Sequence, residues 1–125
     1  MILKLLCCAT ILCLGAVGAW AQPAERYTIV GAGAFSCGKY LEVRSKDRRT
    51  PGVAFTESLM ISWAQGYVSG MNSYRAIANP KREMLVLPDA PSIKAYLDKY
   101  CRDNPLKTVQ DGILELYIEL EFNGR

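Results

Sequence analysis

Cysteines and a set of C-terminal glutamates are the side chains of this chain that could do chemistry. Cys7, Cys8 and Cys13 lie in an apolar stretch at the N-terminus, whereas Cys37 and Cys101 lie beyond it. The chain contains no histidine. Nucleophile systems of the Ser–His and Cys–His type are therefore excluded, and the usual metal sites would need carboxylates alone.

Glu115, Glu119 and Glu121 are candidates for general acid and base chemistry, because paired carboxylates can divide these roles. Glu115 and Glu119 are four residues apart in a predicted helix. Like charges at this spacing repel each other and usually indicate a solvated face. We therefore expect no enzyme, no catalytic residue, no metal and no cofactor.

Cys37 and Cys101 form an even pair, which is typical of a disulfide in a small exported chain. Closing a loop of roughly 65 residues would stabilise the fold by about 4 kcal/mol. A redox or metal pair is the alternative. It is disfavoured because neither cysteine has a second cysteine within three residues and no histidine is present.

The first 21 residues have the features of a signal peptide. Lys4 precedes the apolar run Leu5 to Trp20. The last residues of the leader, Ala19-Trp20-Ala21, have the small residues that signal peptidase requires. This run is shorter than the roughly 20 residues that cross a bilayer. We expect cleavage after Ala21, a periplasmic protein and no stable membrane span. A retained N-terminal anchor is the alternative.

The charge balance argues against a nucleic-acid partner. The chain has 15 basic and 12 acidic residues, a formal net charge of +3. This value is small for a protein that binds a polyanion. The basic cluster Lys46 to Arg49 is more typical of a solvated loop than of a phosphate site. A protein partner is expected instead, and a homodimer stays open.

The exported chain divides into a short segment and one helical domain. Residues 22–35 have little helical patterning and contain proline and glycine, which predicts a flexible or partly extended segment. Residues 36–125 predict an all-α domain, a small bundle of about four helices tied by one disulfide. Ser36 and Thr108 are suitable N-caps for the first and fourth helices.

The second helix is the longest, and we expect it to be central. Its apolar face is predicted from large side chains that recur every three or four residues: Phe55, Leu59, Trp63, Tyr67, Met71 and Tyr74. Gly66 and Gly70 lie inside this helix, where each costs about 1 kcal/mol relative to alanine. We expect them to admit a neighbouring helix at close range. A groove for a ligand is the alternative.

The connection from Ile77 to Pro91 is the longest in the predicted domain. Long connections are often functional, so it is a candidate surface for partner contacts. The alternative is that its leucines only pin it to the core. A third helix is predicted to begin near Pro91 and to end before Asn104 and Pro105.

Three segments, residues 36–42, 62–72 and 100–106, resemble the Tai/Rap-type immunity-protein domain. The residues that carry the resemblance are Trp63, Gly66, Tyr67, Gly70, Asn72, Tyr100, Asn104, Pro105 and Leu106. The resemblance covers about residues 36–120. It implies a small exported helical protein that protects a bacterium by binding a peptidoglycan amidase effector of type VI secretion. It also implies that Cys37 and Cys101 are the disulfide pair.

An immunity protein of this kind would obstruct the cleft of its effector with a loop or a helix edge. Aromatic and arginine anchors dominate such interfaces, so Arg48, Arg49, Tyr74 and Arg75 are candidate contact residues. More distantly, the chain resembles the HdeA/HdeB family of periplasmic acid-stress chaperones, which are also small, helical and held by one disulfide. The alternative function is therefore an acid-stress chaperone. Without histidine, its acid response would have to come from carboxylates.

Overall fold

The computed structural model describes residues 29–123, so the predicted signal peptide and the first half of the segment 22–35 lie outside it. All regular elements within the described residues are helical, which confirms the predicted all-α fold. They are the 3-10 helix η1 (Gly31–Ala34) and the α-helices α1 (Cys37–Ser45), α2 (Val53–Ala78), α3 (Ala90–Asp103) and α4 (Val109–Asn123). None of the described helices combines the length and apolarity needed to cross a membrane.

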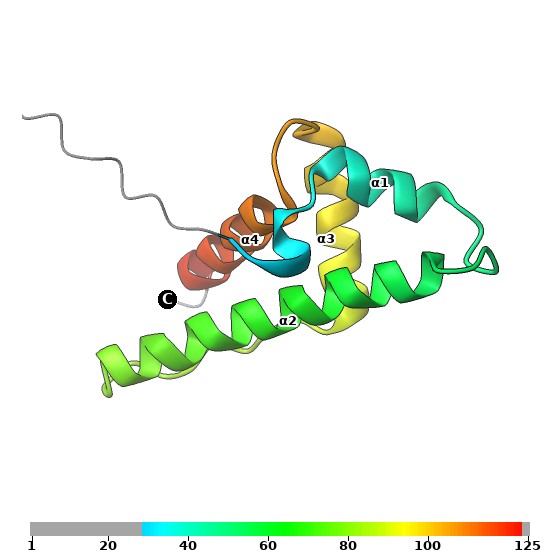
Figure 1. Ribbon diagram of the computed structural model, residues 1–125. Helices are drawn as coiled ribbons and strands as arrows, with labels where there is room; N and C mark the ends of the chain where they lie inside the picture. Colours follow the sequence, from blue (N-terminus) through cyan, green and yellow to red (C-terminus); the bar gives the residue numbers. More distant parts are fainter. Residues whose placement is uncertain (1–28, 124–125) are drawn as a thin grey trace, which may run out of the picture.

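Helix α2 is the long element on which the others are assembled. It has 26 residues, which corresponds to a length of about 39 Å. Helices α1, α3 and α4 all lie on the same side of it, and its opposite side is left uncovered (Figure 1). The bundle is therefore one-sided.

The predicted N-caps begin helices where expected. The Ser36 side chain accepts a hydrogen bond from the N–H of Lys39 at 3.1 Å, which caps α1. At the start of α4, the hydroxyl of Thr108 accepts the N–H of Asp111 at 3.2 Å. The carboxylate of Asp111 in turn accepts the N–H of Thr108 at 2.9 Å. This reciprocal capping satisfies two backbone donors that a helix start leaves unpaired.

Cys37 and Cys101 form the predicted disulfide, with their Cα atoms 4.8 Å apart. It joins the first residue of α1 to the last turn of α3, and both cysteines are fully buried. The N–H of Cys37 donates to the carbonyl of Lys107 at 2.8 Å, and the N–H of Val109 donates to the carbonyl of Phe35 at 2.9 Å. The start of α4 is thus tied to the same junction.

The core is continuous between the four α-helices. The largest fully buried apolar side chains are Tyr40, Met60, Ile93, Leu97 and Ile113. The described part of the segment 22–35 also reaches this core, because Ala32 and Gly33 of η1 are buried. That part forms a 3-10 helix where the sequence indicated a flexible or partly extended stretch.

The predicted apolar face of α2 is only partly right, because Trp63, Tyr67 and Met71 pack against the core. Its buried side is formed by Val53, Glu57, Met60, Ile61, Ala64, Val68 and Asn72. Phe55, Leu59 and Tyr74, which the prediction placed in the core, are exposed instead. The reason is that α2 has apolar residues around most of its circumference, so the spacing of the large ones did not identify the buried side.

The glycines that allow close packing are also different from those predicted. A Cβ atom added to Gly66 or Gly70 would meet nothing within 4 Å, so no neighbouring helix approaches them. A Cβ atom on Gly112 of α4 would lie 2.8 Å from the Tyr100 ring, which makes Gly112 the close contact between α3 and α4. Gly33 has the same role between η1 and α2.

Candidate functional site

The side chain of Asn72 holds the connection between α2 and α3 against the helix. Asn72 is only 2% exposed. Its Nδ2 donates to the carbonyl of Leu85 at 2.9 Å, and its Oδ1 accepts the N–H of the same residue at 3.0 Å. One side chain thus satisfies both backbone groups of Leu85, as a neighbouring strand would. The connection is therefore fixed at its centre without being helix or strand.

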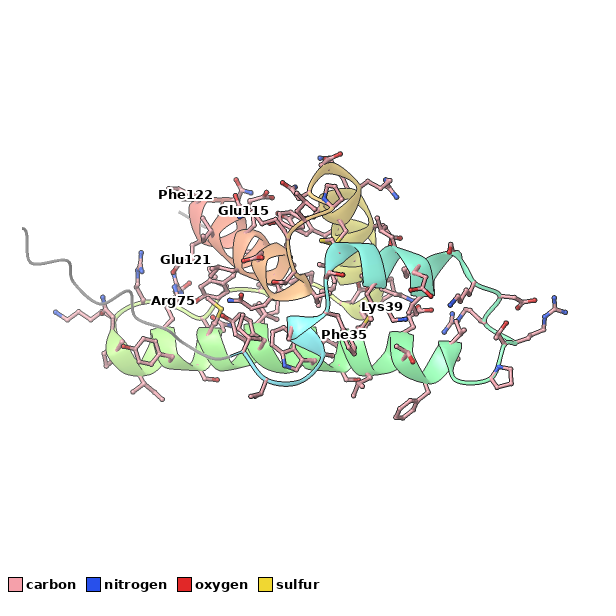
Figure 2. The ribbon with its side chains drawn as sticks, turned by 45° about the horizontal axis from the view of Figure 1, so that its top comes forward. Phe35, Lys39, Arg75, Glu115, Glu121 and Phe122 are labelled. Atoms are coloured by element: carbon pink, nitrogen blue, oxygen red, sulfur yellow. A yellow bond between two sulfur atoms is a disulfide. The ribbon has the colours of Figure 1, made fainter. Side chains whose placement is uncertain are left out.

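Arg75 anchors the same connection from the last turn of α2. Its Nε donates to Oε1 of Glu121 at 2.9 Å, and its guanidinium also donates to the carbonyl of Glu83. Figure 2 shows Arg75 and Glu121 next to each other, where α2 approaches the end of α4. The Arg75 side chain is only 12% exposed, so this residue supports the connection from inside.

Residues 81–84 are exposed, and residues 84–87 present side chains alternately to solvent and to the core. Met84 is 58% exposed and Val86 is 91% exposed. Leu85 and Leu87 are half-buried and pack on the core. These two leucines therefore pin the connection to the core, as the alternative interpretation of this segment predicted. Beside this stretch lies a hollow of about 630 Å³. We call residues 81–87 and this hollow the connection surface.

The walls of the hollow combine cationic and apolar side chains. They are Arg75, Lys81, Arg82, Glu83, Met84, Leu85, Val86, Leu120 and Asn123. The guanidinium of Arg82 lies 3.5 Å from the carboxylate of Glu121, which is an ion-pair distance. The Arg82 side chain is nevertheless 42% exposed. The connection surface thus offers an exposed apolar tip with a methionine and an accessible guanidinium, and methionine and arginine are both enriched at protein interfaces.

The four predicted contact residues do not form one site. Arg48 and Arg49 belong to the loop between α1 and α2, at the opposite end of α2 from Tyr74 and Arg75 (Figure 1). Arg48 lies 3.4 Å from the buried carboxylate of Glu57. Tyr74 is 72% exposed but lines a different hollow. Of the four, only Arg75 lines the connection surface.

That other hollow is apolar and has glycines in its wall. Its volume is about 420 Å³, and it is lined by Gly66, Tyr67, Gly70, Met71, Tyr74 and Tyr117. Gly66 and Gly70 leave open space where side chains would otherwise project. The sequence alternative of a groove at the glycines therefore describes the structure better than close helix packing does.

Trp63 and Tyr67 pack α2 against η1 and α4. The indole N–H of Trp63 donates to the carbonyl of Val30 at 3.0 Å, and its ring stacks on Tyr67 with centroids 4.9 Å apart. The hydroxyl of Tyr67 accepts a hydrogen bond from Nε2 of Gln110 at 3.0 Å. Trp63 and Tyr67, both in the segment 62–72, therefore hold α2 against η1 and α4.

The segment 100–106 ends α3 and leads into α4. Both the N–H and Nδ2 of Asn104 donate to the carbonyl of Tyr100, at 2.9 and 3.0 Å. Pro105 and Leu106 continue the turn on the surface, where Leu106 is 97% exposed. Tyr100 and Asn104 thus terminate the helix beside the disulfide, and Leu106 has no packing role.

A buried ionic cluster was missed by the sequence analysis. Glu57 of α2 is 3% exposed, and its carboxylate lies 3.4 Å from Arg44 of α1 and 3.1 Å from Lys94 of α3. Breaking a buried pair leaves an uncompensated charge, which is strongly destabilising. Only tertiary packing brings these residues together, since no local pattern relates them.

Asp98 extends this cluster by linking α3 to α1. Its carboxylate accepts two hydrogen bonds from Arg44, at 2.9 and 2.8 Å, and one from the hydroxyl of Tyr40 at 2.9 Å. The hydrogen bond from Arg44 holds the pKa of Asp98 below its usual value. Burial, helped by the Asp98 carboxylate, raises the pKa of Tyr40. An ionised Asp98 and a protonated Tyr40 are the states that make these hydrogen bonds, so the cluster ties α3 to α1 at neutral pH.

The described residues contain no prepared metal site, because no three His, Cys, Asp or Glu side chains among them are grouped to hold an ion. Comparisons with protein-family models, with curated proteins and with solved structures find no match. The geometry therefore defines the class of protein: a small disulfide-tied helical bundle with a fixed, solvent-facing connection.

Proposed function

We propose that this chain is an exported binding protein that blocks a peptidoglycan amidase effector, as Tai/Rap-type immunity proteins do. The observation that carries this proposal is the connection surface, which is exposed and yet held in place. Met84 and Val86 face solvent on either side of Leu85, and Leu85 is fixed by Asn72. The disulfide supports export, because such bonds persist in oxidising compartments.

A fixed apolar loop suits obstruction of an enzyme's cleft. Ordering a mobile loop on binding opposes affinity, whereas a loop that is already held in its bound shape avoids that loss. Val86 is the most exposed apolar side chain of the connection surface, at 91%. It would be the central contact, with Met84 beside it and Arg82 at the rim. Arg75 and Asn72 would act through the loop that they support.

The test is whether this chain inhibits a peptidoglycan amidase encoded beside its gene, and the absence of any such gene would contradict the proposal. The processed chain should bind that amidase and stop its hydrolysis of peptidoglycan. Val86→Asp should weaken inhibition at least tenfold, because it places a charge at the centre of the contact. Leu106→Asp is the matched control, since Leu106 is equally exposed but lies in the turn before α4. Equal inhibition by both variants would contradict the assignment of the surface.

Asn72→Ala tests the role of the clamp. The fold should persist, but Leu85 would lose both backbone partners and the connection should become mobile. We expect faster proteolysis within residues 80–87 and weaker inhibition of the amidase. Unchanged proteolysis would show that the clamp does not hold the loop.

An acid-stress chaperone is the second candidate, and the ionic cluster favours it. Glu57 and Asp98 link α1, α2 and α3 through cations, so protonating these carboxylates would loosen three helices together. The processed chain should then suppress aggregation of a denatured client near pH 2 to 3. A chain that stays folded there and protects no client would eliminate this candidate.

A further inference from the structure

A third hollow lies between α3 and α4, apart from the connection surface and from the apolar hollow on α2. Its volume is about 370 Å³. Helix α3 contributes two tyrosines, Tyr96 and Tyr100, and α4 contributes two glutamates, Glu115 and Glu119. Figure 2 shows Glu115 on the side of α4 that faces away from α2. The hollow shares no lining residue with the other two, so it is a separate feature of the fold.

The two tyrosine rings of this hollow are held in place. The hydroxyl of Tyr96 donates to Oε1 of Glu119 at 2.8 Å. The ring of Tyr100 lies against Gly112 of α4, where a Cβ atom would come within 2.8 Å of it. The planes of the two rings differ by only 13°, and their centroids are 6.4 Å apart. The hollow therefore presents nearly parallel aromatic rings whose positions are fixed before any ligand binds.

The glutamates of the hollow lack cationic partners. Among the described residues, no basic side chain forms an ion pair with Glu115 or Glu119. Lys99 also lines the hollow, but it pairs with Asp103 at 2.9 Å. Asn104 directly follows α3 and lines the hollow too, so the negative end of this helix dipole lies there. Because like charges four residues apart repel each other, a bound cation would stabilise this negative region of a chain whose formal net charge is +3.

An organic cation fits this hollow better than a metal ion does. No three carboxylates among residues 29–123 are grouped closely enough to hold a metal. Aromatic faces attract organic cations, and a guanidinium is a flat group that also stacks on a ring. The same group can donate two parallel hydrogen bonds to a carboxylate such as that of Glu115, whereas an ammonium acts as a point charge. A guanidinium therefore suits both the rings and the glutamates.

The surface beside the hollow favours a protein as the source of this guanidinium. On α4, Ile118 and Phe122 each follow one of the two glutamates by three residues, so they share a face with them. Ile118 is 36% exposed and Phe122 is 65% exposed. A free small cation would leave these apolar side chains uncovered, whereas a protein would pack on them around a central arginine. We infer that the hollow between α3 and α4 binds an arginine side chain of a protein partner. This arginine site is independent of the proposed contact between the connection surface and an amidase.

Proton NMR titration of the processed chain with the blocked peptide acetyl-Ala-Arg-Ala-amide tests the arginine site. The Hδ protons of the peptide arginine should shift upfield, because they would lie against the tyrosine rings, and the Kd should be in the millimolar range. The same peptide with citrulline in place of arginine keeps the shape but loses the charge, so it should bind at least about fivefold more weakly. Free L-arginine should bind no more tightly than the arginine peptide.

Two variants of equal charge test which carboxylate is responsible. Glu115→Gln should raise the Kd of the arginine peptide about three- to fivefold, because it removes one exposed ion pair. Glu42→Gln is the matched control, since it changes the net charge of the chain equally but lies on α1, and it should leave the Kd unchanged. Both glutamates are exposed, so both variants should stay folded, with melting temperatures close to that of the wild type.

Three results would overturn the arginine site. The first is an equal Kd for the arginine and citrulline peptides, and the second is an unchanged Kd in Glu115→Gln. The third is tighter binding of free L-arginine than of the arginine peptide, which would assign the hollow to a small cation instead of a protein.

Discussion

Replacing Gly33 with alanine should destabilise the protein, whereas the same change at Gly38 should stabilise it. A Cβ atom on Gly33 would lie 2.2 Å from two carbons of the Trp63 ring, far inside van der Waals contact. The φ angle of Gly33 is not positive, so alanine fits the backbone there and the conflict is purely steric. At Gly38 the nearest atom, the hydroxyl oxygen of Ser36, would be 3.8 Å away.

The cost at Gly33 depends on what Trp63 loses when it moves. Its ring cannot shift without weakening its hydrogen bond to Val30 and its stacking on Tyr67. Overpacking costs about 1 to 3 kcal/mol, and the lost hydrogen bond adds about 1 kcal/mol. We therefore expect Gly33→Ala to lower the free energy of unfolding by about 2 to 4 kcal/mol. Gly38→Ala should raise it by up to about 1 kcal/mol, because alanine is the better helix former in α1.

Urea unfolding of the oxidised chain, followed by circular dichroism at one protein concentration, measures both effects. The steric origin is tested in a Trp63→Phe background, where the ring atoms nearest to Gly33 are absent and the penalty of Gly33→Ala should shrink. A Gly33→Ala variant as stable as the wild type would refute the reasoning. So would a penalty that is unchanged when Trp63 is replaced.

Two further predictions concern the junctions between helices. Cys101→Ser should lower the free energy of unfolding by about 4 kcal/mol, because the disulfide spans 64 residues. The urea midpoint of this variant should match that of the reduced wild type and fall well below that of the oxidised wild type. Asp98→Asn should flatten the acid dependence of stability. The pKa of Asp98 is lowered mainly by its hydrogen bond to Arg44, so its stabilisation is present above the unfolded value of about 3.9 and is lost as the pH falls through the folded value. An unchanged slope of unfolding free energy between pH 5 and 2 would contradict this role.

Helix boundaries could be predicted because their signals are local. Ser36 and Thr108 cap α1 and α4, as their side chains and positions indicated. The buried face of α3 was also predictable, since polar residues occupy most of its other side, whereas α4 exposes Ile118 and Phe122 and buries Gln110. In α2 the same approach was right for Trp63, Tyr67 and Met71 and wrong for Phe55, Leu59 and Tyr74, because a helix with apolar residues around most of its circumference does not reveal which side meets the core.

Close packing at glycine could not be predicted from the helix that contains it. Gly66 and Gly70 had the spacing of a packing groove, but Gly33 and Gly112 make the close contacts. The difference depends on which side chain of another element lies opposite. For Gly33 that side chain is Trp63, which is thirty residues away in the chain.

The sequence by itself determined the all-α fold, the helix starts and the pair of cysteines, because these follow from local propensities and from the short list of reactive side chains. Tertiary structure alone decided that Asn72 clamps Leu85, that Glu57 is surrounded by cations from three elements, and that one apolar face of α2 stays uncovered. Each of these depends on distances between residues on different elements. Local patterns contain no information about such distances, because packing sets them only when the helices assemble.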